Sequence, residues 1–75
     1  MPINLQKQQN VEVTFLVQGG SENIAMVEGH FASRGCRIPR KRPNGSGVYV
    51  SGVLSNVDAE DIKGLLADNE NIAIA

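Results

Sequence analysis

Two stretches of the chain alternate hydrophobic and polar residues with a period of two, which is typical of strands with one buried face. The first covers residues 11–18, where Val11, Val13, Phe15 and Val17 alternate with Glu12, Thr14, Leu16 and Gln18. The second covers residues 48–54, with Val48, Val50 and Leu54 on one face and Tyr49, Ser51 and Val53 on the other. A shorter segment, 71–75, repeats the spacing with Ile72 and Ile74 and is predicted as the last strand.

Two further segments show the spacing of an amphipathic helix. In the first, Ser21 is the predicted N-cap, because its hydroxyl can accept a hydrogen bond from a free helix N–H. The residues expected to face the core there are Ile24, Val27 and Phe31. In the second, Asp58 is the predicted cap, with Asp61 completing a capping box. The predicted buried stripe of this second helix is Ile62, Leu65 and Leu66.

Between the first helix and the central strand lies a short segment, 36–42, that contains Pro39. Proline removes a ladder donor, so this segment is predicted to be an edge strand or an extended arm. A turn is expected over 43–47, which is rich in glycine, asparagine and proline. The resulting order of strand, helix, strand, strand, helix, strand resembles the ferredoxin-like βαββαβ arrangement. That resemblance implies an α+β fold with a four-stranded antiparallel sheet, both helices on one face, and the first and third strands at the centre.

The composition supports one small folded domain. The chain has 75 residues, of which 41% are hydrophobic and 20% charged, a balance typical of a globular chain. We expect a flexible polar arm over residues 1–9 and a single domain over 10–75. A core this small favours association with a partner or a second copy, so a homo-oligomer is expected. With no long apolar run and no apolar signal segment, the chain is expected to be cytoplasmic and without a membrane partner.

Candidate catalytic and metal-binding residues are scarce. Cys36 and His30 are the only residues of their kinds, so neither an internal disulfide nor a zinc-type cluster is expected. Cys36 is interpreted as a small buried residue, although its basic neighbours would activate an exposed thiol. We therefore expect no enzymatic activity, no metal and no cofactor.

The strongest feature is a basic cluster in an otherwise acidic chain. Residues 34–42 carry a formal charge of +5, whereas the net charge of the chain is −1. The cluster, with the nearby Tyr49 expected on the helix-free face, is the predicted partner-binding site: Arg34, Arg37, Arg40, Lys41, Arg42 and Tyr49. Arginine binds phosphate and carboxylate groups in pairs of hydrogen bonds, so the expected partner is an acidic protein surface or a nucleic acid. The sequence leaves these two partners unresolved.

Three other interpretations remain open. Charged residues and proline on an edge strand also prevent aggregation, and the cations can pair with the acidic second helix. A self-assembling subunit is another possibility. The third rests on residues 11–38, which resemble an ACT regulatory module at the level of the fold. This resemblance implies a small effector near the loop of Gly19, Gly20 and Ser21, where glycines open the helix N-terminus to a ligand.

Overall fold

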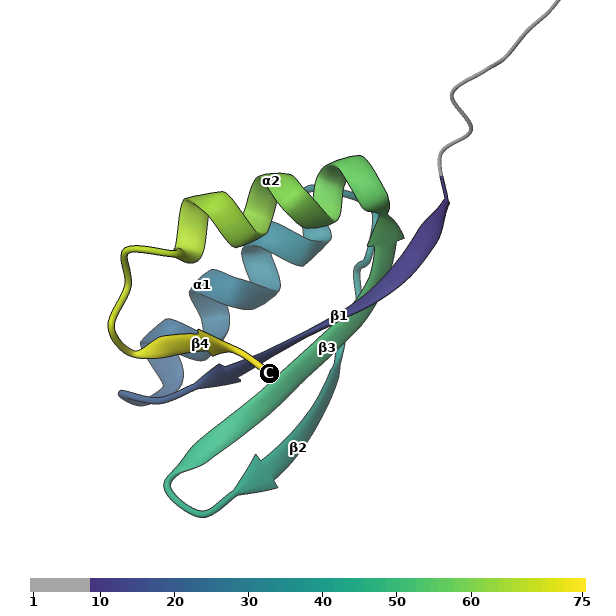
Figure 1. The fold of residues 1–75 in the computed structure, drawn as a ribbon. Coiled ribbons are helices and arrows are strands. Elements are labelled where there is room, and N and C mark those ends of the chain that lie inside the picture. Colours follow the sequence, from purple (N-terminus) through teal and green to yellow (C-terminus); the bar gives the residue numbers. More distant parts are fainter. Residues whose placement is uncertain (1–8) are drawn as a thin grey trace, which may run out of the picture.

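The computed structural model describes residues 9–75 and shows a four-stranded antiparallel sheet with two helices (Figure 1). The elements are β1 (Asn10–Val17), α1 (Ser21–Ala32), β2 (Arg40–Asn44), β3 (Gly47–Ser55), α2 (Asn56–Leu66) and β4 (Ile72–Ile74). The strand order is β2-β3-β1-β4, so β1 and β3 are central, as their apolar alternation predicted. Most of the predicted arm, 1–9, lies outside the described residues. Gln9 is described, and its carbonyl accepts a hydrogen bond from the Asn56 N–H at 2.8 Å.

One hydrophobic core lies between the sheet and the two helices. Val13, Phe15 and Val17 of β1 are buried, whereas the residues between them are only partly buried. Alternate residues of a strand point to opposite faces, so β1 directs its apolar residues to one side. Both helices contribute to this same core, through Val27 and Phe31 of α1 and through Ala59, Ile62 and Leu66 of α2. Within residues 9–75, the opposite face of the sheet therefore carries no helix.

The β2–β3 hairpin differs from the sequence prediction in its bounds. Pro39 precedes β2 instead of lying inside it, and Pro43 lies within the ladder opposite Val48. Only Gly45 and Ser46 form the turn, with Asn44 paired to Gly47. Gly45 has a φ of 62°, a conformation that glycine adopts without strain. The turn is therefore tighter than expected, and the basic residues 40–42 are held in the sheet.

Both predicted helix caps were wrong. Ser21 is the first residue of α1, and Gly20 occupies the N-cap position without a side-chain cap. In α2 the cap is Ser55, whose hydroxyl oxygen accepts a hydrogen bond from the N–H of Asp58 at 3.1 Å. The N-cap is therefore Ser55, three residues before Asp58, and Asp58 lies in the first turn of the helix.

Leu65, which was expected in the core, and Ile74 of the last strand are both exposed. Leu65 is 57% exposed, because the buried side of α2 runs through Ala59, Ile62 and Leu66 at spacings of three and four. Ile74 is also 57% exposed, since it lies on the edge strand β4. Within residues 9–75, neither helix has the length and hydrophobicity needed to cross a membrane.

Candidate functional site

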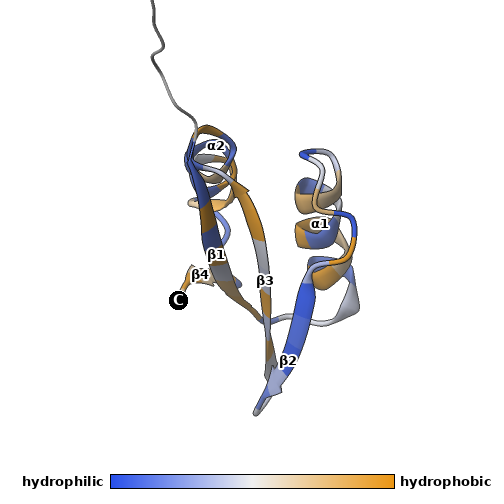
Figure 2. Ribbon diagram, turned by 90° about the vertical axis from the view of Figure 1, so that its right-hand side faces the viewer, coloured by the Kyte–Doolittle hydropathy of each residue, from blue (hydrophilic) through white to orange (hydrophobic). Residues whose placement is uncertain are grey.

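The helix-free face of the sheet, called the open face below, is built by alternate residues of β1, β2 and β3. The strand register places Arg42 beside Tyr49, and Tyr49 beside Leu16. Two residues further along each strand, Arg40 lies beside Ser51, and Ser51 lies beside Thr14. The next step pairs Glu12 with Val53. Figure 2 shows that β2 is the most hydrophilic strand of the sheet.

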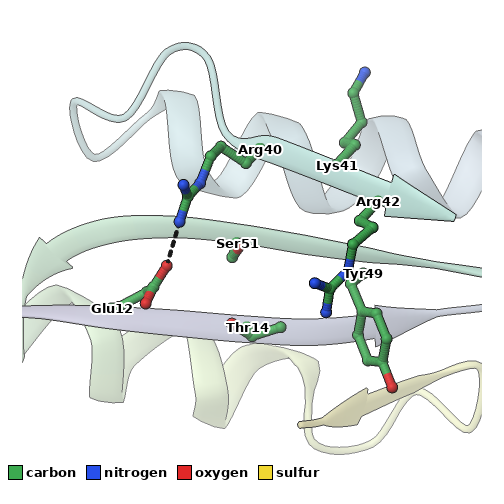
Figure 3. A pocket seen from close by; sticks show the side chains of 7 residues that line it. All are labelled: Glu12, Thr14, Arg40, Lys41, Arg42, Tyr49 and Ser51. Carbon is green, nitrogen blue, oxygen red and sulfur yellow. Dashed lines mark hydrogen bonds and ion pairs between the residues drawn. The ribbon is translucent and has the colours of Figure 1, made fainter. Parts of the chain in front are cut away.

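Arg40 crosses the open face. Its guanidinium reaches over β3 from β2 and donates a hydrogen bond to Glu12 Oε2 on β1 at 2.9 Å (Figure 3). Ser51, on the strand between β2 and β1, lies beside this ion pair. The Arg40–Glu12 pair therefore forms a polar bridge across the central strand.

Arg42 and Tyr49 form the second feature of the open face. They are cross-strand neighbours, and the guanidinium carbon of Arg42 lies 5.2 Å from the centroid of the Tyr49 ring. An arginine at this distance from an aromatic ring makes a cation–π interaction. The contact holds the guanidinium against the sheet, and among residues 9–75 no carboxylate forms an ion pair with it. Arg42 is therefore a positioned cation with free donors.

Two neighbouring hollows share residues of the open face, and the second also reaches Gly35 and Cys36 after α1. The first, of about 490 Å³, is lined by Glu12, Thr14, Arg40, Lys41, Arg42, Tyr49 and Ser51. The second, of about 360 Å³, is lined by Glu12, Gly35, Cys36, Ile38, Arg40, Ser51, Gly52 and Val53. Both share Glu12, Arg40 and Ser51, so the polar bridge forms the boundary between them. Away from this boundary, the first hollow is lined by Arg42 and Tyr49, and the second by Cys36, Ile38 and Val53.

The remaining residues of the basic cluster point elsewhere. Arg34 is only 16% exposed and donates to Asp61 Oδ2 on α2 at 2.7 Å and to the carbonyl of His30. Lys41 pairs with Glu28 of α1 at 2.7 Å, because it lies between two open-face residues of β2 and points to the helix side. Arg37 is exposed in the connection before β2 and lines neither hollow.

The structure therefore divides a cluster that is continuous in sequence. It brings together Arg40, Arg42 and Tyr49 and separates Arg34 and Arg37 from them, while Lys41 borders the first hollow but pairs its ammonium with Glu28. Sequence reasoning did not include Glu12, Thr14, Ile38 and Val53 in the candidate site. The alternation of β1 already indicated that Glu12 and Thr14 lie opposite the core, but the diagonal contact with Arg40 depends on the strand register.

The glycine loop before α1 has a structural explanation. Gly19 and Gly20 have φ values of 91° and 101°, which glycine adopts without strain. A side chain at position 19 would collide with Asn23, whose amide nitrogen donates to the Gln18 carbonyl at 3.0 Å. Close packing and a tight turn thus require glycine there, and Ser21 makes no side-chain cap. Neither of the two hollows includes this loop.

Few groups capable of covalent or metal chemistry surround the open face. Cys36 is half-buried, packs against the core and has a free thiol. In the part of the chain that the structure describes, no three His, Cys, Asp or Glu side chains gather as metal ligands would. The arrangement is suited to binding by charge, stacking and apolar contact. Comparisons with protein-family models, with curated proteins and with solved structures gave no match.

Proposed function

We propose that this protein is a non-enzymatic binding module whose open face binds an acidic segment of another protein. We also propose that its architecture is ferredoxin-like, on the basis of its element order and its β2-β3-β1-β4 sheet. The observation that carries the functional proposal is the positioned guanidinium of Arg42 beside Tyr49, at the rim of a hollow. A free arginine fork is suited to a carboxylate because it donates two parallel hydrogen bonds.

The charge distribution favours a protein partner over a nucleic acid. Glu12, Glu28 and Asp61 neutralise Arg40, Lys41 and Arg34 within the chain. On the open face only Arg42 is left without a carboxylate partner in the described residues. Nucleic-acid binding draws most of its affinity from several phosphate contacts. One stacked arginine and one tyrosine are better matched to a single carboxylate on a peptide.

The edge of β2 favours binding through side chains over the addition of a strand. A proline inside a ladder lies where its missing N–H would point away from the neighbouring strand. The backbone N–H of Lys41 points to the free edge in the same way, because Lys41 is two residues from Pro43 along the strand. Pro39 occupies the position two residues before Lys41. Two of these three positions thus offer no donor to an added strand. The partner is expected to lie on the open face instead.

Fluorescence anisotropy tests the proposal with a labelled peptide rich in glutamate and with a labelled oligothymidine of similar length. We expect the peptide to bind, and Arg42→Ala to weaken it about fivefold, as for the loss of one charge-assisted pair. Lys63→Ala is the matched control, because it removes a cation of α2 that pairs with Glu60. Equal binding of the peptide by wild type and Arg42→Ala would overturn the proposal. Binding of the oligonucleotide alone would replace the acidic protein with a nucleic acid.

A further inference from the structure

The second hollow, which begins at the open face, is bordered by the most exposed large hydrophobic residue of the described chain. Ile38 is 90% exposed, and Val53, which lines the same hollow, is 57% exposed. Cys36 and Gly52 also line this hollow, which has a volume of about 360 Å³. An exposed apolar patch rimmed by polar residues is typical of an interaction site. This hollow therefore has room for one apolar side chain.

The two hollows lie in line along β3. Val53 marks the apolar hollow and Tyr49 marks the cationic hollow, and both side chains are on the open face. They are four residues apart, which is about 13 Å at the usual rise of a strand. An extended segment lying along β3 presents every second side chain to the sheet. Its positions i and i+4 would thus reach the two hollows together.

Between the hollows, the Arg40–Glu12 bridge crosses β3 beside Ser51. A ligand side chain at position i+2 would meet this bridge. A small residue fits there without breaking the ion pair, whereas a large one would have to displace it. The bridge thus restricts the size of the ligand side chain at position i+2, and the hollows determine which side chains fit at positions i and i+4.

We infer that the open face binds an extended protein segment with an apolar side chain and a carboxylate four residues apart, separated by a small central residue. The apolar side chain lies against Ile38 and Val53, and the carboxylate binds the guanidinium of Arg42 beside Tyr49. This inference rests on the proposed function, since it assumes that the open face binds a peptide. It adds a pattern and a spacing to the acidic character proposed above.

Synthetic peptides test the spacing directly. The probe is a fluorescein-labelled peptide with the central sequence Leu-Thr-Ser-Thr-Glu, flanked by glycine and serine. One comparison peptide has serine in place of leucine, and another has glutamate directly after leucine. We expect each comparison peptide to bind about five- to tenfold more weakly, because each loses the contact with one hollow. Equal affinity for all three peptides would overturn the inference.

Protein variants locate the apolar contact. Val53→Ser and Ile38→Ser should each weaken the leucine peptide about threefold to fivefold and leave the serine peptide unchanged. Both side chains are exposed, so the fold is expected to persist, which circular dichroism checks. Val57→Ser is the matched control, because Val57 is 59% exposed but belongs to α2. A loss of the same size in Val57→Ser would overturn the inference.

The two proposals fail in different ways. If peptides bind and depend on Arg42 but not on leucine, the spacing is wrong and the acidic binding face stands. If the leucine peptide binds equally well to Arg42→Ala, the acidic binding face is wrong, and the spacing falls with it.

Discussion

Gly52 lies where β3 comes closest to the end of α1. A β-carbon at this position would be 2.6 Å from the sulfur of Cys36 and 3.0 Å from two carbons of the Phe31 ring. Phe31 is fully buried and packs edge-to-face against Phe15, with the ring centroids 6.0 Å apart. The ring has little room to move in a close-packed interior. Glycine is therefore required here by packing and not by a backbone angle.

We expect Gly52→Ala to lower the free energy of unfolding by roughly 1–3 kcal/mol, which is the usual cost of overpacking a core. Urea denaturation measures it. Gly64→Ala is the control, because Gly64 lies within α2 and a β-carbon there would meet nothing within 4 Å, so alanine should stabilise by about 0.5–1 kcal/mol. The double variant Gly52→Ala/Cys36→Ala should recover part of the loss, since it removes the sulfur. Equal stability of Gly52→Ala and wild type would contradict this account.

At the scale of elements, α2 begins directly after β3 and takes its cap from the last residue of that strand. Ser55 is in an extended conformation, with φ −63° and ψ 154°, as N-cap residues usually are. Its neighbour Asn56 donates its N–H to the Gln9 carbonyl and accepts from the Gln9 N–H through its side chain. These contacts join the start of α2 to the start of β1. The strand-to-helix junction is thus held from two sides.

We expect Ser55→Ala to lower the free energy of unfolding by about 1 kcal/mol, because the N–H of Asp58 loses its acceptor. Asp58→Ala should cost less, since that carboxylate contributes only its interaction with the helix dipole. Thermal or urea unfolding of the two variants under the same conditions measures the difference. A larger loss for Asp58→Ala would return the cap to the residue that the sequence indicated.

Across the whole molecule, ion pairs link the helices to each other and to the sheet, and prolines limit hydrogen bonding at the free edge of β2. Arg34 joins α1 to α2 through Asp61, and Lys41 joins β2 to α1 through Glu28. These two cations hold the helices and the sheet edge together, so the basic cluster is partly a structural feature. The prolines at positions 39 and 43 remove donors from the free edge of β2, which opposes pairing of that edge with another copy.

We expect Pro43→Thr to increase self-association, because threonine restores an outward N–H and favours strands. Light scattering over a range of protein concentrations measures the mass of both proteins. Ser46→Thr is the control, since Ser46 lies in the turn of the same hairpin and outside the ladder. An unchanged mass for Pro43→Thr would mean that features other than proline protect this edge.

The sequence by itself determined the type and order of the elements, the central position of β1 and β3, and the side of β3 on which Tyr49 lies. These follow from local periodicity, because alternation in a strand assigns each side chain to a face. Only the tertiary structure decided which cations act together. Arg40 and Arg42 meet Glu12 and Tyr49 across strands that are distant in sequence, and Lys41 between them points to α1. Register and cross-strand contacts are properties of the assembled sheet, so nine consecutive residues with five cations could not reveal them.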